Sequence, residues 1–159
     1  MERNISAIGL GIEDSSALAA SLNDLLANYQ IFYQNLRGFH WNIKGDKFFE
    51  LHLKFEELYN DVILKIDEVA ERILTLGSTP LHAYSDYLAS SEIKEAKNLS
   101  DTSSTITTTL GNFTALVVKE RALLKQAQEI GDEGTATLMS DYISQQEKTI
   151  WMLSAYQNR

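Results

Sequence analysis

The sequence predicts an all-α protein, a four-helix bundle with one long crossover that carries a short extra helix. Four long segments repeat apolar residues at the three- and four-residue spacing of one helix face. The 159 residues include only eight glycines and one proline, so few residues interrupt these helices. Two of the three connections are short and the central one is long, which is the pattern of a bundle with one crossover.

The apolar pattern sets the approximate limits of the four long helices, and the capping residues agree with them. The helices are expected over residues 15–41, 47–76, 102–130 and 133–156. Asp14 or Ser15 is the expected N-cap of the first helix, and Asp46 that of the second. Gly77 and Gly131 stand where a helix end favours a left-handed backbone. The short links make the first and second helices, and the third and fourth, antiparallel neighbours.

The central connection runs from Ser78 to Asp101 and contains the only proline. Thr79-Pro80 resembles an N-cap followed by proline at the first helical position. This pair predicts a short helix over residues 80–89. The whole chain is then expected to be one domain, 1–159, with residues 1–13 as a short N-terminal extension.

Composition excludes several classes of protein. Apolar residues make up 44% of the chain, which argues against disorder. The absence of cysteine excludes disulfides and thiolate metal sites. We expect a cytoplasmic protein with no membrane association, because neither a signal-peptide pattern nor a stretch of about 20 apolar residues is present. The net charge is −8, and Arg3 is the only lysine or arginine among the first fourteen residues. Both features disfavour nucleic-acid binding.

Two pairs of potential metal ligands lie on the second predicted helix. His52 and Glu56 are four residues apart, as are Asp67 and Glu71, so each pair occupies one face. Fifteen residues from His52 to Asp67 correspond to roughly 22 Å of helix. Because metal–ligand bonds are about 2.0–2.3 Å long, one ion cannot bridge the two pairs within one chain. A shared centre therefore requires two chains, related by a two-fold axis that makes two such centres.

His40 is expected to complete one side of this centre. His40 and His52 flank the turn near Lys44 at comparable heights, so they can converge within one chain. Two imidazoles and a carboxylate from one subunit would face two carboxylates from its neighbour. Nitrogen and oxygen ligands without sulfur suit iron, manganese or zinc.

Ordinary structural roles compete with these assignments. A histidine or an acidic pair at helical spacing is common on solvated helix faces. The aromatic residues Trp41, Phe48, Phe49 and Tyr59 fit core or interface packing, and Trp151 fits the core. His82 has no partner in the sequence and is expected at the surface of the short helix. No glutamate precedes a histidine by three residues, so a di-iron site inside one bundle is disfavoured.

Several segments together resemble the Dps family, the mini-ferritins of the ferritin-like superfamily. The resemblance covers about residues 14–156. Its most specific parts are His40-Trp41, Phe48-Phe49-Glu50-Leu51-His52 and Asp67-Glu68-Val69-Ala70-Glu71-Arg72, joined by Leu76-Gly77-Ser78-Thr79-Pro80 and Ile150-Trp151-Met152.

The resemblance implies a hollow homododecameric shell built from two-fold dimers, with ferroxidase centres at the dimer interfaces. His40 and His52 would bind iron from one subunit, and Asp67 and Glu71 from the partner. Glu56 stands where the family often has aspartate, so it can bind directly, act through water or only shape the surroundings. Trp41 matches an aromatic residue thought to take up oxidising equivalents.

The implied activity is oxidation of Fe(II), preferably by hydrogen peroxide, with storage of Fe(III) mineral and protection against oxidative damage. Asp132, Glu133 and Asp141 are candidates for acidic pore or inner-wall positions, with an ordinary solvated turn as the alternative. Two other functions stay open: a shell that binds zinc or another divalent ion without redox turnover, and a structural shell that coats DNA. The missing basic arm, a departure from DNA-binding members of the family, predicts weak or absent DNA binding.

Overall fold

A computed structural model describes residues 4–158, so residues 1–3 of the expected N-terminal extension, Arg3 included, and Arg159 lie outside the described residues. Within the described range the chain forms five helices: α1 (Ile12–Asn42), α2 (Phe48–Thr75), α3 (Tyr84–Ser90), α4 (Thr102–Glu129) and α5 (Glu133–Tyr156). None of these helices combines the length and the apolar character needed to cross a bilayer.

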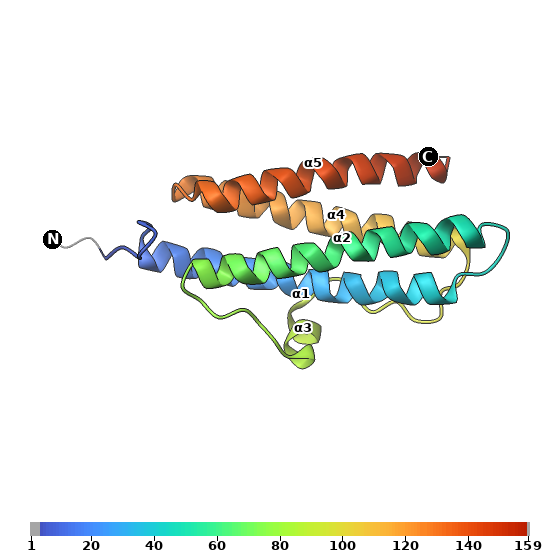
Figure 1. Cartoon of the computed structure of the whole chain (residues 1–159), viewed down its shortest axis with the longest axis horizontal. Coiled ribbons are helices and arrows are strands. Elements are labelled where there is room, and N and C mark those ends of the chain that lie inside the picture. The colour runs from blue at the N-terminus through green and yellow to red at the C-terminus, as the bar shows by residue number, and fades with distance from the viewer. Residues whose placement is uncertain (1–3, 159) are drawn as a thin grey trace.

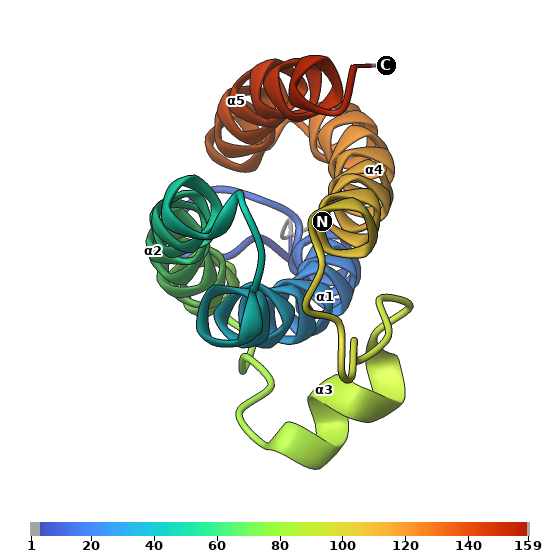
Figure 2. The ribbon, with the colours of Figure 1, turned by 90° about the vertical axis from the view of Figure 1, so that its right-hand side faces the viewer.

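The four long helices form the bundle that the sequence predicts. Figure 1 shows them side by side, with the long connection between α2 and α4 running outside the bundle. Seen from the end in Figure 2, α3 lies beside α1, away from α5. Helix α1 packs against α2, α3 and α4, while α4 packs against α5. Helix α1 is thus the central element of the fold.

Apolar side chains from all four long helices fill the core. Phe32 of α1 meets Phe113 of α4 edge-on, with 4.9 Å between ring centroids. Phe39 and Phe55 join α1 to α2 at 5.5 Å. Trp151 contradicts the prediction of a core position, because 65% of its surface is exposed. Residues Ile150 to Leu153 carry an unbroken apolar run, so the sequence pattern could not select which of them faces inward.

The C-terminal ends of two helices agree with the sequence prediction, whereas the N-caps of the first two helices do not. Gly77 and Gly131 adopt φ values of 87° and 75°, which confirms their predicted left-handed positions. The predicted N-caps of the first two helices are wrong. Helix α1 begins three residues before Ser15, with Gly11 as its N-cap, and α2 follows Lys47; neither cap residue makes a side-chain capping bond.

The crossover differs from the prediction at Pro80. The short helix begins at Tyr84 rather than Pro80, and His82 is exposed in the extended segment before it. Asn23 of α1 explains the extended segment, because its side chain donates to the Thr79 carbonyl and accepts from the Leu81 amide. These bonds to the backbone take the place of helical hydrogen bonds.

Two further asparagines of α1 hold the rest of the crossover. The Oδ1 atom of buried Asn28 accepts from the amides of Glu92 and Ile93. Asn35 donates to the Lys94 carbonyl and accepts from the Ala96 amide. Buried backbone groups of a segment without regular structure are thereby satisfied, as burial requires.

A buried polar cluster lies in the middle of the bundle. Glu120 of α4 is fully buried, and the Tyr29 hydroxyl of α1 donates to its carboxyl group at 3.3 Å. Gln146 of α5 donates to the Tyr29 hydroxyl, and Lys65 of α2 contributes a nearby positive charge. Burial raises the pKa of Glu120 to about 8, although Tyr29, Lys65 and Gln146 oppose this rise.

This cluster predicts that stability falls with pH between about 4.5 and 8. Folded Glu120 keeps its proton in this range while the unfolded chain loses it, at a cost of up to about 1.4 kcal/mol per pH unit. Replacing Glu120 with glutamine removes this term. Guanidinium unfolding at pH 5, 7 and 9 should therefore show that the unfolding free energy of Glu120→Gln rises relative to that of the native protein as pH rises.

The matched control is Glu129→Gln, an exposed carboxylate on the same helix. Its unfolding free energy should track the native value at all three pH values. A Glu120→Gln difference that stays constant with pH would show that folded Glu120 titrates like an ordinary carboxyl group.

Candidate metal centre

The structure brings His40 and His52 together. His40 lies in the last turn of α1 and His52 near the start of α2, on either side of the short turn between them. Their rings are stacked, with centroids 3.8 Å apart and planes 14° apart. His40 is only 8% exposed, whereas His52 is partly exposed. The predicted convergence of these two histidines within one chain is therefore observed.

Reciprocal hydrogen bonds fix both imidazole rings. His40 Nδ1 lies 2.6 Å from the carbonyl oxygen of His52, and His52 Nδ1 lies 2.7 Å from the carbonyl oxygen of His40. A carbonyl oxygen only accepts, so each Nδ1 atom carries the proton and donates. In the neutral rings each Nε2 atom then has a free lone pair. A metal-binding histidine usually donates its other N–H in this way, which fixes the tautomer and the ring direction.

The candidate carboxylates are divided between two distant positions. Glu56 is partly exposed on the same helix as His52, one turn further on. Asp67 and Glu71 are exposed, and α2 is continuous from Phe48 to Thr75. They are thus roughly 22 Å from His52 along the helix axis.

A single chain offers only part of a metal centre. Within residues 4–158, no three histidine or acidic side chains converge as a group able to hold a metal ion. The imidazole pair has donor atoms and tautomers that suit a divalent transition metal, but no third such side chain converges on it among the described residues. The structure therefore leaves Asp67 and Glu71 as predicted ligands for a neighbouring subunit.

Two aromatic side chains near the histidines differ in their contacts. Trp41 follows His40 in the sequence but is 56% exposed, and the Arg37 guanidinium lies 4.8 Å above its ring. Tyr59 contacts the His40 ring edge-on, with centroids 5.3 Å apart. The sequence pattern predicts only a packing role for Tyr59. Its position seven residues after His52, two helical turns away on the same face, was the available signal.

One acidic residue of the turn between α4 and α5, Asp132, has a structural role. Asp132 is 2% exposed, caps α5 and accepts from Arg72 Nη2 at 2.6 Å. It is therefore neither a pore-lining carboxylate nor part of a solvated turn. A side chain at Gly134 would lie 2.8 Å from the Arg72 guanidinium, so glycine permits this approach. Glu133 and Asp141 are exposed and stay candidates for acidic surface positions.

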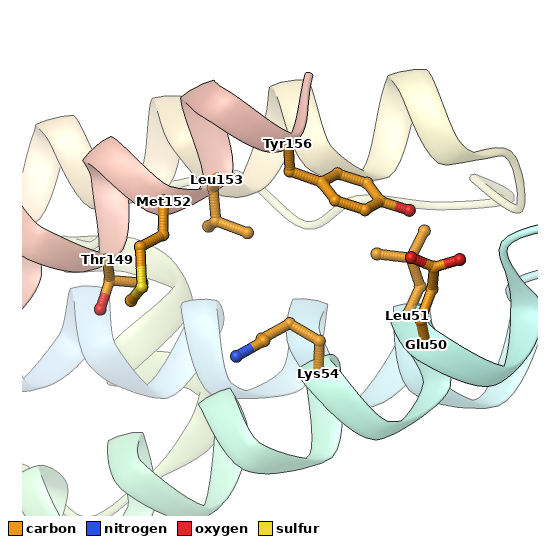
Figure 3. A pocket seen from close by; sticks show the side chains of 7 residues that line it. All are labelled: Glu50, Leu51, Lys54, Thr149, Met152, Leu153 and Tyr156. Carbon is orange, nitrogen blue, oxygen red and sulfur yellow. The ribbon is translucent and has the colours of Figure 1, made fainter. Parts of the chain in front are cut away.

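A separate pocket of about 200 Å³ lies between α2 and α5. Figure 3 shows its residues: Glu50, Leu51, Lys54, Thr149, Met152, Leu153 and Tyr156. Burial, with the neighbouring Glu50, raises the pKa of Tyr156. The pocket has one carboxylate and no imidazole, so it does not fit a transition-metal centre.

Comparisons with known proteins agree on the family. A model of the ferritin family, described as a ferritin-like domain, matches residues 19–159. The "DNA protection during starvation protein" of Porphyromonas gingivalis is 44% identical, over 98% of both chains.

Solved structures give the same answer. A Dps protein from Vibrio cholerae O1, described as a member of a broad superfamily of ferritin-like diiron-carboxylate proteins, is 53% identical, with a TM-score of 0.95 over 96% of both chains. A Dps protein from Bacillus brevis is 34% identical, with a TM-score of 0.88 over 91% of this chain and 97% of that one. Together with the sequence motifs and the observed four-helix bundle, these likenesses show that the chain belongs to the Dps family of the ferritin-like superfamily.

Proposed function

We propose that this protein is a ferroxidase and iron-storage mini-ferritin that oxidises Fe(II), preferably with hydrogen peroxide, at centres between subunits. The observation that carries the proposal is the stacked pair of His40 and His52, whose Nδ1 protons are committed to backbone carbonyls. This arrangement presents two imidazole nitrogens to a metal. The likeness to diiron-carboxylate proteins makes iron the metal to expect.

The partner's half of the centre would be Asp67 and Glu71. An antiparallel two-fold contact between two α2 helices would place these carboxylates opposite the histidine pair, and would create two equal centres per dimer. The outward surface of α2 supports such a contact. It exposes several large apolar side chains, namely Phe49, Leu53, Ile63, Leu64 and Leu74, which a solvated helix rarely presents together. Family membership extends this dimer to a shell of twelve subunits.

The chemistry requires two Fe(II) ions held near each other. Two Fe(II), one hydrogen peroxide and two protons give two Fe(III) and two waters, so both electrons reach peroxide without releasing a radical. His40 and His52 would bind iron from one subunit, and Asp67 and Glu71 from the other. Glu56 would add a carboxylate directly or through water, and Trp41 would take up oxidising equivalents that escape the centre.

Replacing Asp67 and Glu71 together with alanine should abolish rapid Fe(II) oxidation. Removing even an outer hydrogen-bond partner of a metal ligand costs about 10- to 100-fold, and loss of two ligands should cost at least as much. Anaerobic stopped-flow measurement of Fe(III) formation after peroxide addition tests this, with light scattering to verify assembly.

The control is Glu95→Ala/Glu129→Ala, which removes the same charge from exposed positions on other elements. It should oxidise iron at the native rate. Equal rates in all three proteins would mean that the α2 carboxylates are merely solvated. Tight zinc binding without iron oxidation in the native protein would favour the non-redox shell instead.

Complementation between two inactive proteins tests whether the ligands come from different chains. Neither His52→Ala nor Asp67→Ala/Glu71→Ala should be active alone. In a mixed dimer, one centre combines the intact histidines of one chain with the intact carboxylates of the other. Random pairing on co-expression should therefore restore about one quarter of the centres. If all ligands came from one chain, the mixture would be as inactive as its parents.

A structural DNA-coating role is the second candidate, raised by the names of curated relatives. The net charge of −8 opposes it, since phosphate binding depends on clustered lysine and arginine. Gel shifts with duplex DNA at low salt should show binding weaker even than the dissociation constants of about 10⁻⁴–10⁻⁶ M that non-specific binders have at physiological salt. Tight binding that weakens steeply with added salt would contradict this expectation.

A further inference from the structure

Phe49, near the start of α2, exposes 81% of its surface close to the histidine pair. Its ring meets the Phe48 ring edge-on, with centroids 5.3 Å apart. Phe48 is partly buried against the core and stacks on the His52 ring, with centroids 5.0 Å apart. Phe49 is thus linked to the candidate metal centre by ring contacts, yet most of its own surface faces solvent in the single chain.

A second exposed apolar side chain, Leu74, occupies the corresponding position near the other end of α2. Its surface is 58% exposed. Phe49 precedes Glu56 by seven residues. Leu74 follows Asp67 by seven residues. Because seven residues make about two helical turns, each apolar side chain lies on the same face as its carboxylate, roughly 10 Å along the axis.

The proposed antiparallel contact between two α2 helices brings these two positions together. It places Glu56 of one subunit opposite the partner's Asp67. Moving toward the start of one helix is moving toward the end of its antiparallel partner. Two turns beyond Glu56 on one helix therefore lie opposite two turns beyond the partner's Asp67, where Leu74 stands.

We propose that Phe49 of each subunit packs against the partner's Leu74 and closes the outer end of each metal centre. This inference rests on the proposed function, whose two-fold contact it uses. The two side chains are exposed in the single chain, and the same register that completes the ligand set covers both of them.

Each centre then lies between two apolar contacts. Exposed Ile63 and Leu64 lie between the two half-sites of α2, so they face the partner on the inner side, near the two-fold axis. Phe49 and the partner's Leu74 lie on the outer side. Apolar groups on both sides limit the access of water, and drier surroundings strengthen the attraction between iron and its carboxylate ligands.

The contact can be trapped by a disulfide, because the chain has no cysteine of its own. Positions 49 and 74 are 25 residues apart on one continuous helix, roughly 37 Å, whereas a disulfide needs Cβ atoms about 4 Å apart. Oxidation of assembled Phe49→Cys/Leu74→Cys protein with diamide should therefore give covalent dimers on a non-reducing gel. Either single-cysteine variant, and Phe49→Cys/Val118→Cys, should stay monomeric on that gel. Val118 is the matched control, because it is an apolar residue that is 63% exposed on α4.

The closing role is tested by the release of Fe(II) under anaerobic conditions. Assembled protein loaded with Fe(II) is mixed with an excess of a chelator that absorbs light when it binds Fe(II). Phe49→Ala and Leu74→Ala should each release iron several-fold faster than native protein or Val118→Ala. Phe49→Ala/Leu74→Ala should release it no faster than either single variant, because both changes remove the same contact.

Failure of the inference differs from failure of the proposed function. The absence of covalent dimers in Phe49→Cys/Leu74→Cys overturns the inference, as does equal iron release from native protein and Phe49→Ala. Rapid Fe(III) formation with peroxide would leave the ferroxidase function intact in both cases. If native protein neither retains Fe(II) nor forms Fe(III), the proposed function fails, and the closing role of Phe49 fails with it.

Discussion

The reciprocal bonds between His40 and His52 are the constraint on which the candidate centre depends. Each Nδ1 atom donates to the backbone carbonyl of the other histidine, so the end of α1 and the start of α2 are fastened to each other. The same two bonds set the tautomer of both rings. Because both Nδ1 donors and both carbonyl acceptors are paired within the chain, the two rings are already oriented without a metal. Binding of a metal through the Nε2 atoms would then require little further ordering of these side chains.

Under the proposed function, helix α2 makes a complete centre depend on assembly. It is one uninterrupted helix from Phe48 to Thr75, so the separation between His52 and the pair Asp67 and Glu71 cannot close within a chain. The bonds of Lys65 to Gln145 and of Arg72 to Asp132 fix α2 against α5. The helix therefore holds the two candidate half-sites at a constant distance, as the proposed two-fold contact requires.

Much of the architecture follows from the sequence, because the periodic spacing of apolar residues predicts long helices. The bundle, the antiparallel pairs and the left-handed Gly77 and Gly131 were all predictable. The crossover was not, because Thr79-Pro80 carries a valid local signal for a helix start. Tertiary hydrogen bonds from Asn23 override that signal, and nothing in the local sequence reveals them.

One part of the candidate centre, the convergence of His40 and His52, could be predicted for similar reasons, while the carboxylate ligands stay a prediction. Helical spacing placed His52 with Glu56 and Asp67 with Glu71, and the short turn brought His40 to His52. The hydrogen bonds from the two Nδ1 atoms go to backbone carbonyls. Every residue has a backbone carbonyl, so no sequence pattern could indicate these bonds. Asp132 shows the opposite limit. An acidic residue in a turn suggested a surface role, but its partly buried partner Arg72 lies sixty residues away in the chain.

The interior of the bundle explains why redox chemistry would be confined to the interface. Among the described residues, Glu120 carries the carboxyl group buried in the middle of the bundle, and burial keeps its proton in place at neutral pH. A protonated acid is a poor metal ligand, and the nearby ammonium of Lys65 repels cations. The described interior thus offers iron no competing site. Under the proposed function, an unassembled subunit would hold only the histidine half of a centre, and two-electron reduction of peroxide would begin only once the partner's carboxylates are in place.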